Sequence, residues 1–186
     1  MRVAILGAGS WGTAFAQIAA DAGNEVSIWG RSPKTIEEIN TDHHNFKFHP
    51  DNMLPKSITA STDAQKILKD ADVVVLAIPA QTLRQNLSDW GSSIPSDAFI
   101  LSLLKGIEVG SLERMSQVAT EVLGVDEQRV SVLTGPNLAG EIIKREPAAS
   151  VIACSNETNA HHLQDMCATP YFRPYTSTDV IGCELA

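Results

Sequence analysis

The sequence predicts an α/β fold in which a doubly wound, mainly parallel sheet carries helices on both faces. Short apolar runs of four to six residues, rich in Val, Ile or Leu, are typical of strands buried on both faces of a parallel sheet. Segments with helical spacing lie between these runs, and the links are short, as expected for right-handed crossovers. A glycine-rich loop joins the first run to the first helical segment.

The elements are expected in a regular order along the chain. The strands are expected at Val3–Leu6, Glu25–Trp29, Val73–Ile78, Phe99–Leu103, Val130–Leu133 and Ser150–Ala153. The helices are expected at Trp11–Ala22, Lys34–Asn40, Ala64–Lys69, Thr82–Trp90, Leu112–Leu123 and Asn159–Cys167. Gly23 and Gly124 suit the left-handed residue that closes a helix, and Ser111 is the expected N-cap of the fifth helix. Pro79 is expected to end the third strand, and the polar stretch 41–56 is expected to be a long loop.

Composition limits the class of protein. A chain of 186 residues buries enough apolar surface to fold as one domain without disulfides or metal. Its 14 basic and 22 acidic residues give a net charge of −8, which argues against a nucleic-acid or acidic-membrane partner. Three cysteines without a C-x-x-C pair indicate reduced thiols in a cytoplasmic protein. We expect no membrane insertion and no signal peptide, because no apolar run approaches the roughly 20 residues of a span.

The glycine loop is the strongest local signal. Gly7-Ala8-Gly9-Ser10-Trp11-Gly12 has G-x-G-x-x-G spacing between an expected strand and an expected helix. Gly7 permits the tight turn, Gly9 lets the backbone approach a pyrophosphate, and Gly12 lets the helix pack closely on the strand. The free N–H groups of the helix N-terminus then favour the phosphates. The loop predicts a Rossmann-like, dinucleotide-binding domain.

The end of the second expected strand bears on which dinucleotide binds. An NAD-specific site usually carries Asp or Glu there, roughly 20 residues after the loop, but this chain has Trp29-Gly30-Arg31-Ser32. The planar cation of Arg31 suits a 2′-phosphate and stacking on adenine. We therefore favour NADPH as cofactor. NADH stays open, and so does a merely solvated Arg31.

Two further stretches follow expected strands and point to chemistry beyond cofactor binding. Lys105 lies just past the strand 99–103, at the edge of the sheet where ligands bind. Gly135 and the N–H groups from Asn137 onward can cradle an oxygen or part of a nicotinamide. Plainer explanations remain open, since most lysines are solvated and Asn137 suits the cap of an ordinary strand-to-helix turn.

The histidines carry a weaker signal. His43, His44 and His49 lie near Asp42 and Asp51, but their spacing matches no standard metal-ligand pattern, so we assign them to a polar loop and expect no metal. The adjacent residues 161 and 162 are both His, and neighbouring side chains on a helix diverge, which disfavours a paired role.

Four motifs occur in order along the chain: Gly7-Ala8-Gly9-Ser10-Trp11-Gly12-Thr13-Ala14, Lys105-Gly106-Ile107-Glu108, Gly135-Pro136-Asn137-Leu138-Ala139-Gly140-Glu141 and Gly182-Cys183-Glu184-Leu185-Ala186. Together they resemble the NAD(P)-dependent glycerol-3-phosphate dehydrogenase family. The resemblance runs from the first residue to the last. It implies an oxidoreductase that reduces dihydroxyacetone phosphate to sn-glycerol 3-phosphate, a precursor of phospholipids.

The resemblance also implies residue roles. The implied cofactor contacts are Ser10, Trp11, Arg31, Lys105 and Ala139, beside Gly7, Gly9 and Gly12 of the loop. The implied substrate contacts are Lys105, Gly135 and Asn137, with Lys105 polarising the oxygen that becomes an alkoxide. Bacterial members often have Ser-Phe where this chain has Asn137-Leu138, whereas eukaryotic members have Asn there.

The resemblance implies that part of the enzyme is missing from this chain. The family's general acid is a second lysine in a Glu-Leu-x-Gly-Ala-x-Lys-Asn segment, and this chain stops at Glu184-Leu185-Ala186. We therefore interpret residues 1–186 as the cofactor-binding domain, ending where a helical substrate domain would begin. We expect it to bind dinucleotide without turnover. For the whole protein we expect a cytoplasmic homodimer acting on a phosphorylated small molecule.

Two other interpretations stay open. Another two-domain reductase, of the 3-hydroxyacid or ketopantoate type, shares the glycine loop but is not expected to carry the Lys105 and Gly135 motifs together. A non-catalytic dinucleotide-sensing module predicts cofactor binding alone and leaves Lys105 unexplained.

Overall fold

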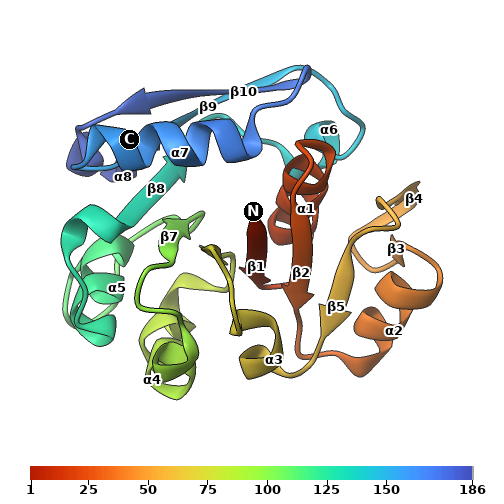
Figure 1. The fold of residues 1–186 in the computed structure, drawn as a ribbon, viewed down its shortest axis with the longest axis horizontal. Helices are drawn as coiled ribbons and strands as arrows, with labels where there is room; N and C mark the ends of the chain where they lie inside the picture. The colour runs from red at the N-terminus through yellow and green to blue at the C-terminus, as the bar shows by residue number, and fades with distance from the viewer. Residues whose placement is uncertain (186) are drawn as a thin grey trace.

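The structure, a computed structural model, describes residues 1–185 and contains one large sheet (Figure 1). Its strands are β1 (Arg2–Leu6), β2 (Glu25–Trp29), β5 (Thr59–Ser61), β6 (Val73–Leu76), β7 (Phe99–Ser102), β8 (Val130–Thr134), β9 (Ala148–Ala153) and β10 (Phe172–Ser177). The strand order is β10-β9-β8-β7-β6-β1-β2-β5. All neighbours are parallel except β8 and β9. The expected doubly wound, mainly parallel α/β fold is confirmed.

Helices cover both faces of the sheet (Figure 1). They are α1 (Ser10–Asp21), α2 (Pro33–Thr41), α3 (Ala64–Leu68), α4 (Leu83–Trp90), α5 (Met115–Leu123), α6 (Ala139–Ile142), α7 (Glu157–Cys167) and α8 (Val180–Leu185), with short 3₁₀ turns η1 (Ala80–Thr82), η2 (Gly91–Ser93) and η3 (Glu127–Arg129). Successive strand side chains face opposite ways. Ile5 accordingly joins the core beneath α1 and α7, whereas Leu6 joins the core beneath α3, α4 and α5. Two cores therefore enclose the sheet.

The expected apolar strands and most helices lie within a few residues of their predicted bounds, but the fifth helix is shorter than predicted. It begins at Met115 rather than Leu112, because residues 107–114 form a tight loop closed by a bridge between Ile107 and Arg114. Leu112 has a φ of 62°, which an α-helix does not allow, and its side chain is 72% exposed. Ser111 was therefore wrong as the N-cap, a position that Arg114 holds.

The polar stretch 41–56 is not a plain loop. It folds into a two-stranded antiparallel ribbon, β3 (His44–Asn45) and β4 (His49–Met53). The edge strands β5 and β10 and the helix α8 were also missed by the sequence. Pro79 does not end the third strand, which stops at Leu76, but precedes η1 as its N-cap.

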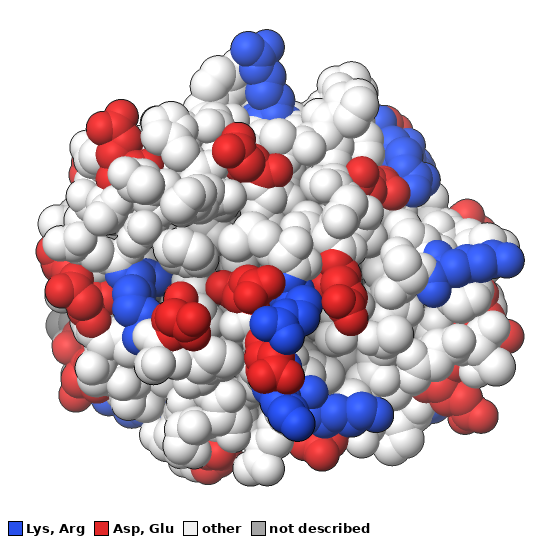
Figure 2. All heavy atoms as spheres, viewed as in Figure 1, with Lys and Arg blue, Asp and Glu red and all other residues white. Residues whose placement is uncertain are grey.

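Charged side chains of both signs are interspersed on the face shown in Figure 2, where no continuous basic surface is seen. Within residues 1–185, no helix has the length and hydropathy needed to cross a membrane. Cys154 and Cys167 are buried and Cys183 is partly buried. Burial raises the pKa of the Cys167 thiol to about 12, so this group stays protonated and unreactive at neutral pH.

One buried carboxylate fastens α8 to α5. Glu184, whose side chain is 2% exposed, accepts hydrogen bonds from the Ser116 N–H at 2.8 Å and the Ser116 hydroxyl at 2.6 Å. It also pairs with the Arg114 guanidinium at 2.8 Å. The negative charge therefore lies at the positive end of α5, where the helix dipole stabilises it.

Replacing Glu184 with Ala is expected to lower the free energy of unfolding by about 3 kcal/mol, since it leaves the partly buried Arg114 guanidinium without its partner. Urea denaturation measures this loss. Glu146→Ala is the matched control, because Glu146 is exposed, and its effect should stay within about 0.5 kcal/mol. Equal effects of the two substitutions would show that this carboxylate does not hold α8.

Candidate functional site

Loops gather where β1, β2, β6, β7 and β8 end, because these strands are parallel. We call this side of the sheet the carboxyl edge. The Gly7 N–H donates to the Trp29 carbonyl at 3.0 Å, and the Ala77 N–H donates to the Leu6 carbonyl at 2.9 Å. Strand β1 lies between β2 on one side and β6 on the other, so the winding of the chain reverses at β1. Ligands of doubly wound folds bind in the crevice at such a point.

A cavity of about 270 Å³, which we call the glycine-loop pocket, lies at this crevice. Its lining combines four segments of the carboxyl edge: Gly7–Gly9, Trp29–Ser32 with Thr35, Lys47–Phe48, and Ala77–Pro79. Arg31 and Lys47 are both exposed cations, and this lining contains no carboxylate. The pocket is therefore suited to an anionic group.

The three glycines of the loop occupy different environments. A Cβ on Gly7 would lie 2.2 Å from the Ala77 carbonyl oxygen, and the φ of Gly7 is 135°. A Cβ on Gly12 would lie 2.1 Å from the Gly7 carbonyl oxygen. No protein atom of the described residues lies within 4 Å of a Cβ built on Gly9. Packing thus excludes side chains at Gly7 and Gly12, whereas at Gly9 the backbone is open to a ligand.

The first turn of α1 presents free backbone donors beside the pocket. The N-cap of the helix is Gly9, which has no side chain to bond the N–H groups that follow. Ser10 and Trp11 form the start of this turn, and Trp11 packs edge-on against Phe15 at a ring separation of 6.0 Å. Such a helix N-terminus combines unpaired N–H groups with a positive dipole end, which suits a phosphate.

The β3–β4 ribbon braces the glycine loop. Asn45, fully buried, donates from Nδ2 to the Ala8 carbonyl at 3.0 Å and to the Thr13 hydroxyl oxygen at 2.9 Å. The buried His49 lies with Nε2 2.9 Å from the Ser10 carbonyl oxygen. The ribbon thereby brings Lys47 and Phe48 to the pocket. Sequence reasoning missed both residues, because only these tertiary contacts reveal them. Within residues 1–185 no group of His, Cys, Asp or Glu is arranged to hold a metal ion.

A second cavity, of about 200 Å³, lies along the carboxyl edge at the ends of β7 and β8. Lys105, exposed at its rim, donates from Nζ to the Gly135 carbonyl at 3.4 Å. The side-chain oxygen of Asn137 accepts from the Ser150 hydroxyl at 2.8 Å, and the backbone N–H of Asn137 donates to the Gly135 carbonyl at 2.8 Å. The structure therefore brings Lys105 to a residue 30 positions later in the chain.

The role of Asn137 as a helix cap was wrong, since Leu138 is the N-cap of α6. The helix α6 begins at Ala139 and packs against α1, which carries Ser10 and Trp11. The side chain of Asn137 points instead to β9, through Ser150. Of the site residues expected from the sequence, Gly7, Gly9 and Arg31 line the glycine-loop pocket and Lys105 lines the second cavity. The other expected residues line neither cavity; they are Ser10, Trp11, Gly12, Gly135, Asn137 and Ala139.

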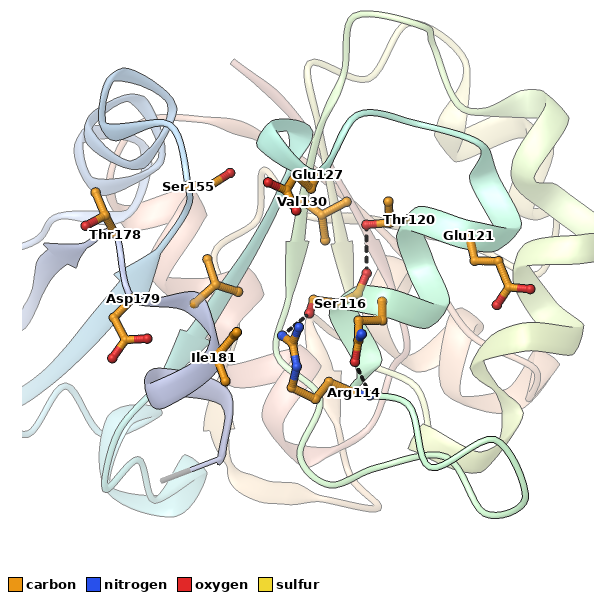
Figure 3. A pocket seen from close by; sticks show the side chains of 12 residues that line it. Arg114, Ser116, Thr120, Glu121, Glu127, Val130, Ser155, Thr178, Asp179 and Ile181 are labelled. Atoms are coloured by element: carbon orange, nitrogen blue, oxygen red, sulfur yellow. Dashed lines mark hydrogen bonds between the residues drawn. The ribbon is translucent and has the colours of Figure 1, made fainter.

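A larger hollow, of about 440 Å³, lies between α5 and the start of α8 (Figure 3). Two charged side chains in its lining are already paired, Arg114 with Glu184 and Glu121 with Arg84. Val130 in its wall is the first residue of β8, so the hollow lies at the opposite edge of the sheet from the glycine loop. Its position, and the pairing of Arg114 and Glu121 with other residues, make it a weaker candidate for the ligand site.

Comparison with known proteins gives a consistent result. The family model described as NAD-dependent glycerol-3-phosphate dehydrogenase N-terminus matches residues 2–160. Glycerol-3-phosphate dehydrogenase (NAD(P)+) of Corynebacterium diphtheriae is 53% identical over 185 residues, covering 100% of this chain and 56% of that protein. The corresponding protein of Thermobifida fusca is 52% identical, covering 99% and 55%. The chain thus spans about half the length of the curated relatives it matches.

Comparison with solved structures agrees with the sequence comparison. The crystal structure of glycerol-3-phosphate dehydrogenase from Coxiella burnetii superposes with a TM-score of 0.90 at 28% identity, covering 98% of this chain and 55% of that chain. A ketopantoate reductase from Ralstonia eutropha superposes with a TM-score of 0.72 at 20% identity, covering 99% and 59%. The second likeness shows a shared fold alone.

Gly12→Ala is expected to lower the free energy of unfolding by about 2 kcal/mol, because the new methyl group meets the Gly7 carbonyl and forces the backbone apart. Thermal denaturation measures the change. Gly140→Ala is the control, since nothing lies within 4 Å of that Cβ. It should be neutral or stabilising by up to about 1 kcal/mol. A neutral Gly12→Ala would contradict the close approach of α1 to the loop.

Proposed function

The chain belongs to the NAD-dependent glycerol-3-phosphate dehydrogenase family, and we propose that residues 1–186 are the cofactor-binding domain of such an enzyme. The whole protein would reduce dihydroxyacetone phosphate to sn-glycerol 3-phosphate. The observation that carries this proposal is the placement of Lys105 against Gly135 at the same sheet edge as the glycine loop. A dinucleotide extended along that edge would reach both cavities.

The residues around the glycine-loop pocket fit a nicotinamide dinucleotide. The open backbone at Gly9 and the free N–H groups of α1 would hold its pyrophosphate. Arg31 and Lys47 would face the adenosine end, where two cations without a nearby carboxylate favour the 2′-phosphate of NADPH. Phe48, on the same pocket wall, offers an apolar ring to the adenine. When bound, the dinucleotide supplies the hydride.

Lys105 would be the catalytic residue of this domain. Its ammonium lies at the edge of the second cavity, where it can donate a hydrogen bond to the carbonyl oxygen of a bound substrate. A positive charge at that oxygen stabilises the alkoxide that develops in the transition state. Gly135, which Lys105 contacts, and Asn137 would lie beside this cavity and contact the substrate, and Ala139, at the start of α6, would lie against the cofactor.

The remaining assignments rest on the family resemblance alone. They are a proton donor outside residues 1–186, a helical substrate domain that contacts the phosphate, reduction in the service of phospholipid synthesis, a cytoplasmic location and a homodimer. Residues 1–186 by themselves would bind dinucleotide without turnover, since a missing general acid costs about 10²–10⁴ in rate. A non-catalytic sensing module is disfavoured because it gives Lys105 and its contact with Gly135 no role.

Arg31→Asp is expected to weaken NADPH binding by roughly 10- to 100-fold and NADH binding by less than about threefold, because it removes one charge-assisted contact to the 2′-phosphate. Fluorescence titration of residues 1–186 with each cofactor measures this. Arg173→Asp, at an exposed position on the edge strand β10, is the control for the change of charge. Equal weakening for both cofactors would exclude 2′-phosphate recognition by Arg31.

Lys105→Ala is expected to lower turnover of the whole enzyme by about 10²–10³, the cost of one transition-state donor. Its thermal stability should be unchanged, since the side chain is exposed. Steady-state oxidation of NADPH with dihydroxyacetone phosphate measures the rate. Lys69→Ala, an exposed position just after α3, is the control. Near-normal turnover in a folded Lys105→Ala protein would refute the proposed catalytic role.

A further inference from the structure

The loop that carries Lys105 lies between β7 and α5 and has no regular structure of its own. Gly106 and Gly110 have φ values of 98° and 103°, so the backbone turns sharply on both sides of Ile107–Val109. Among the described residues, the hydrogen bond recorded for the Lys105 side chain is the 3.4 Å contact with the Gly135 carbonyl. A single long bond to an exposed side chain holds it weakly. The position of Lys105 therefore depends on what holds the loop backbone.

Gln81 holds this backbone with both ends of its amide. Its Nε2 donates to the Ile107 carbonyl at 2.8 Å, and its Oε1 accepts from the Val109 N–H at 2.9 Å. The two bonds lie on either side of residue 108, two and four positions after Lys105. A side-chain amide carries a donor and an acceptor on two different atoms, so it can bond a carbonyl and an N–H at the same time. Gln81 therefore fixes both the position and the orientation of the loop.

Arg84 supports the same loop one helical turn further on. Its guanidinium contacts both carboxylate oxygens of Glu108 at 3.0–3.1 Å and reaches Glu113 at 2.9 Å. These contacts with Arg84 hold the pKa of Glu108 below its ordinary value. The side chain of Arg84 is 37% exposed, so solvent screens this pair. Gln81 is also exposed, but its two bonds are made to the loop backbone itself, at Ile107 and Val109, and are the more direct restraint on Lys105.

The segment that carries Gln81 also forms part of the glycine-loop pocket. Ala77, Ile78 and Pro79 line that pocket, and the Ala77 carbonyl lies against Gly7. Gln81 follows Pro79 by two residues, within the short 3₁₀ turn η1. One short segment after β6 therefore touches the dinucleotide pocket at its start and the Lys105 loop at its end.

We propose that Gln81 is a positioning residue that sets Lys105 at a fixed place relative to the bound dinucleotide. It acts through the backbone of Ile107 and Val109 and does not touch the substrate. The proposal rests on the proposed function, because it assumes that Lys105 acts on the reacting oxygen. A displacement of about 1 Å in such a group can cost about 100-fold in rate, so a backbone clamp matters even without direct contact.

The test compares Gln81→Met with Gln85→Met in the whole enzyme. Methionine keeps the length of the side chain and loses both hydrogen bonds. Gln85 is an exposed residue of α4 whose recorded bond is local, to Asp89. Gln81→Met is expected to lower kcat by at least about 10-fold, with the Kd for NADPH within twofold and the melting temperature unchanged. Gln85→Met should leave all three unchanged.

A double-mutant cycle with Lys105→Ala separates positioning from a structural role. If Gln81 acts through Lys105, adding Gln81→Met to Lys105→Ala should change kcat by less than twofold. Hydrogen exchange of the Val109 amide in residues 1–186 gives a readout independent of activity. It should become at least 10-fold faster in Gln81→Met and stay unchanged in Gln85→Met.

Each other outcome overturns the proposal in a distinguishable way. A normal kcat in Gln81→Met, while Lys105→Ala is impaired, would leave the proposed function intact and remove the role of Gln81. The same loss of kcat in both backgrounds would show that Gln81 does not act through Lys105. Unchanged exchange at Val109 would show that the clamp does not exist in solution. Normal turnover in Lys105→Ala itself would overturn both proposals.

Discussion

The site depends on the close approach of three backbone segments around Gly7. The Gly7 position faces the Ala77 carbonyl after β6, and the Gly12 position faces the Gly7 carbonyl, so neither tolerates a side chain. This contact seats the N-terminus of α1 at the point where the sheet reverses its winding. It also fixes the start of the segment that continues to Gln81. The same backbone contact around Gly7 therefore positions both the pocket that suits phosphate and the loop that carries Lys105.

The sequence predicted the fold where the signal was local and apolar. The central strands β1, β6, β7 and β8 are rich in Val, Ile and Leu, because both of their faces are covered. The strands it missed lack that signal. The segment Thr59–Ser61 is short and polar, and β10 contains a proline at its centre, which a strand tolerates at the edge of a sheet. The ribbon β3–β4 is held by Asn45, whose partner Ala8 is 37 residues away.

In the candidate site, too, features with a local sequence signal could be predicted, whereas features formed by long-range contacts could not. The glycine loop is a contiguous motif, so its geometry could be predicted from its spacing together with the strand expected before it and the helix expected after it. The contact of Lys105 with Gly135 depends on β7 and β8 being neighbours, which a parallel sheet made plausible but did not specify. No sequence pattern marked Gln81 or Lys47 as part of the site. Their place there depends on loops that contact residues far away in the sequence. The tight turn at Leu112 was missed for a related reason, since helical spacing of apolar residues continued into it.

Charge illustrates why local structure decides the ligand. A net charge of −8 disfavours polyanionic partners at long range, and a dinucleotide phosphate is itself an anion. At physiological ionic strength, however, charges beyond about 8 Å are largely screened. The lining of the glycine-loop pocket holds Arg31 and Lys47 and no carboxylate, while α1 adds its positive dipole end. An acidic protein can therefore offer an anion site, provided that its acidic residues lie outside the crevice and its backbone donors lie within it.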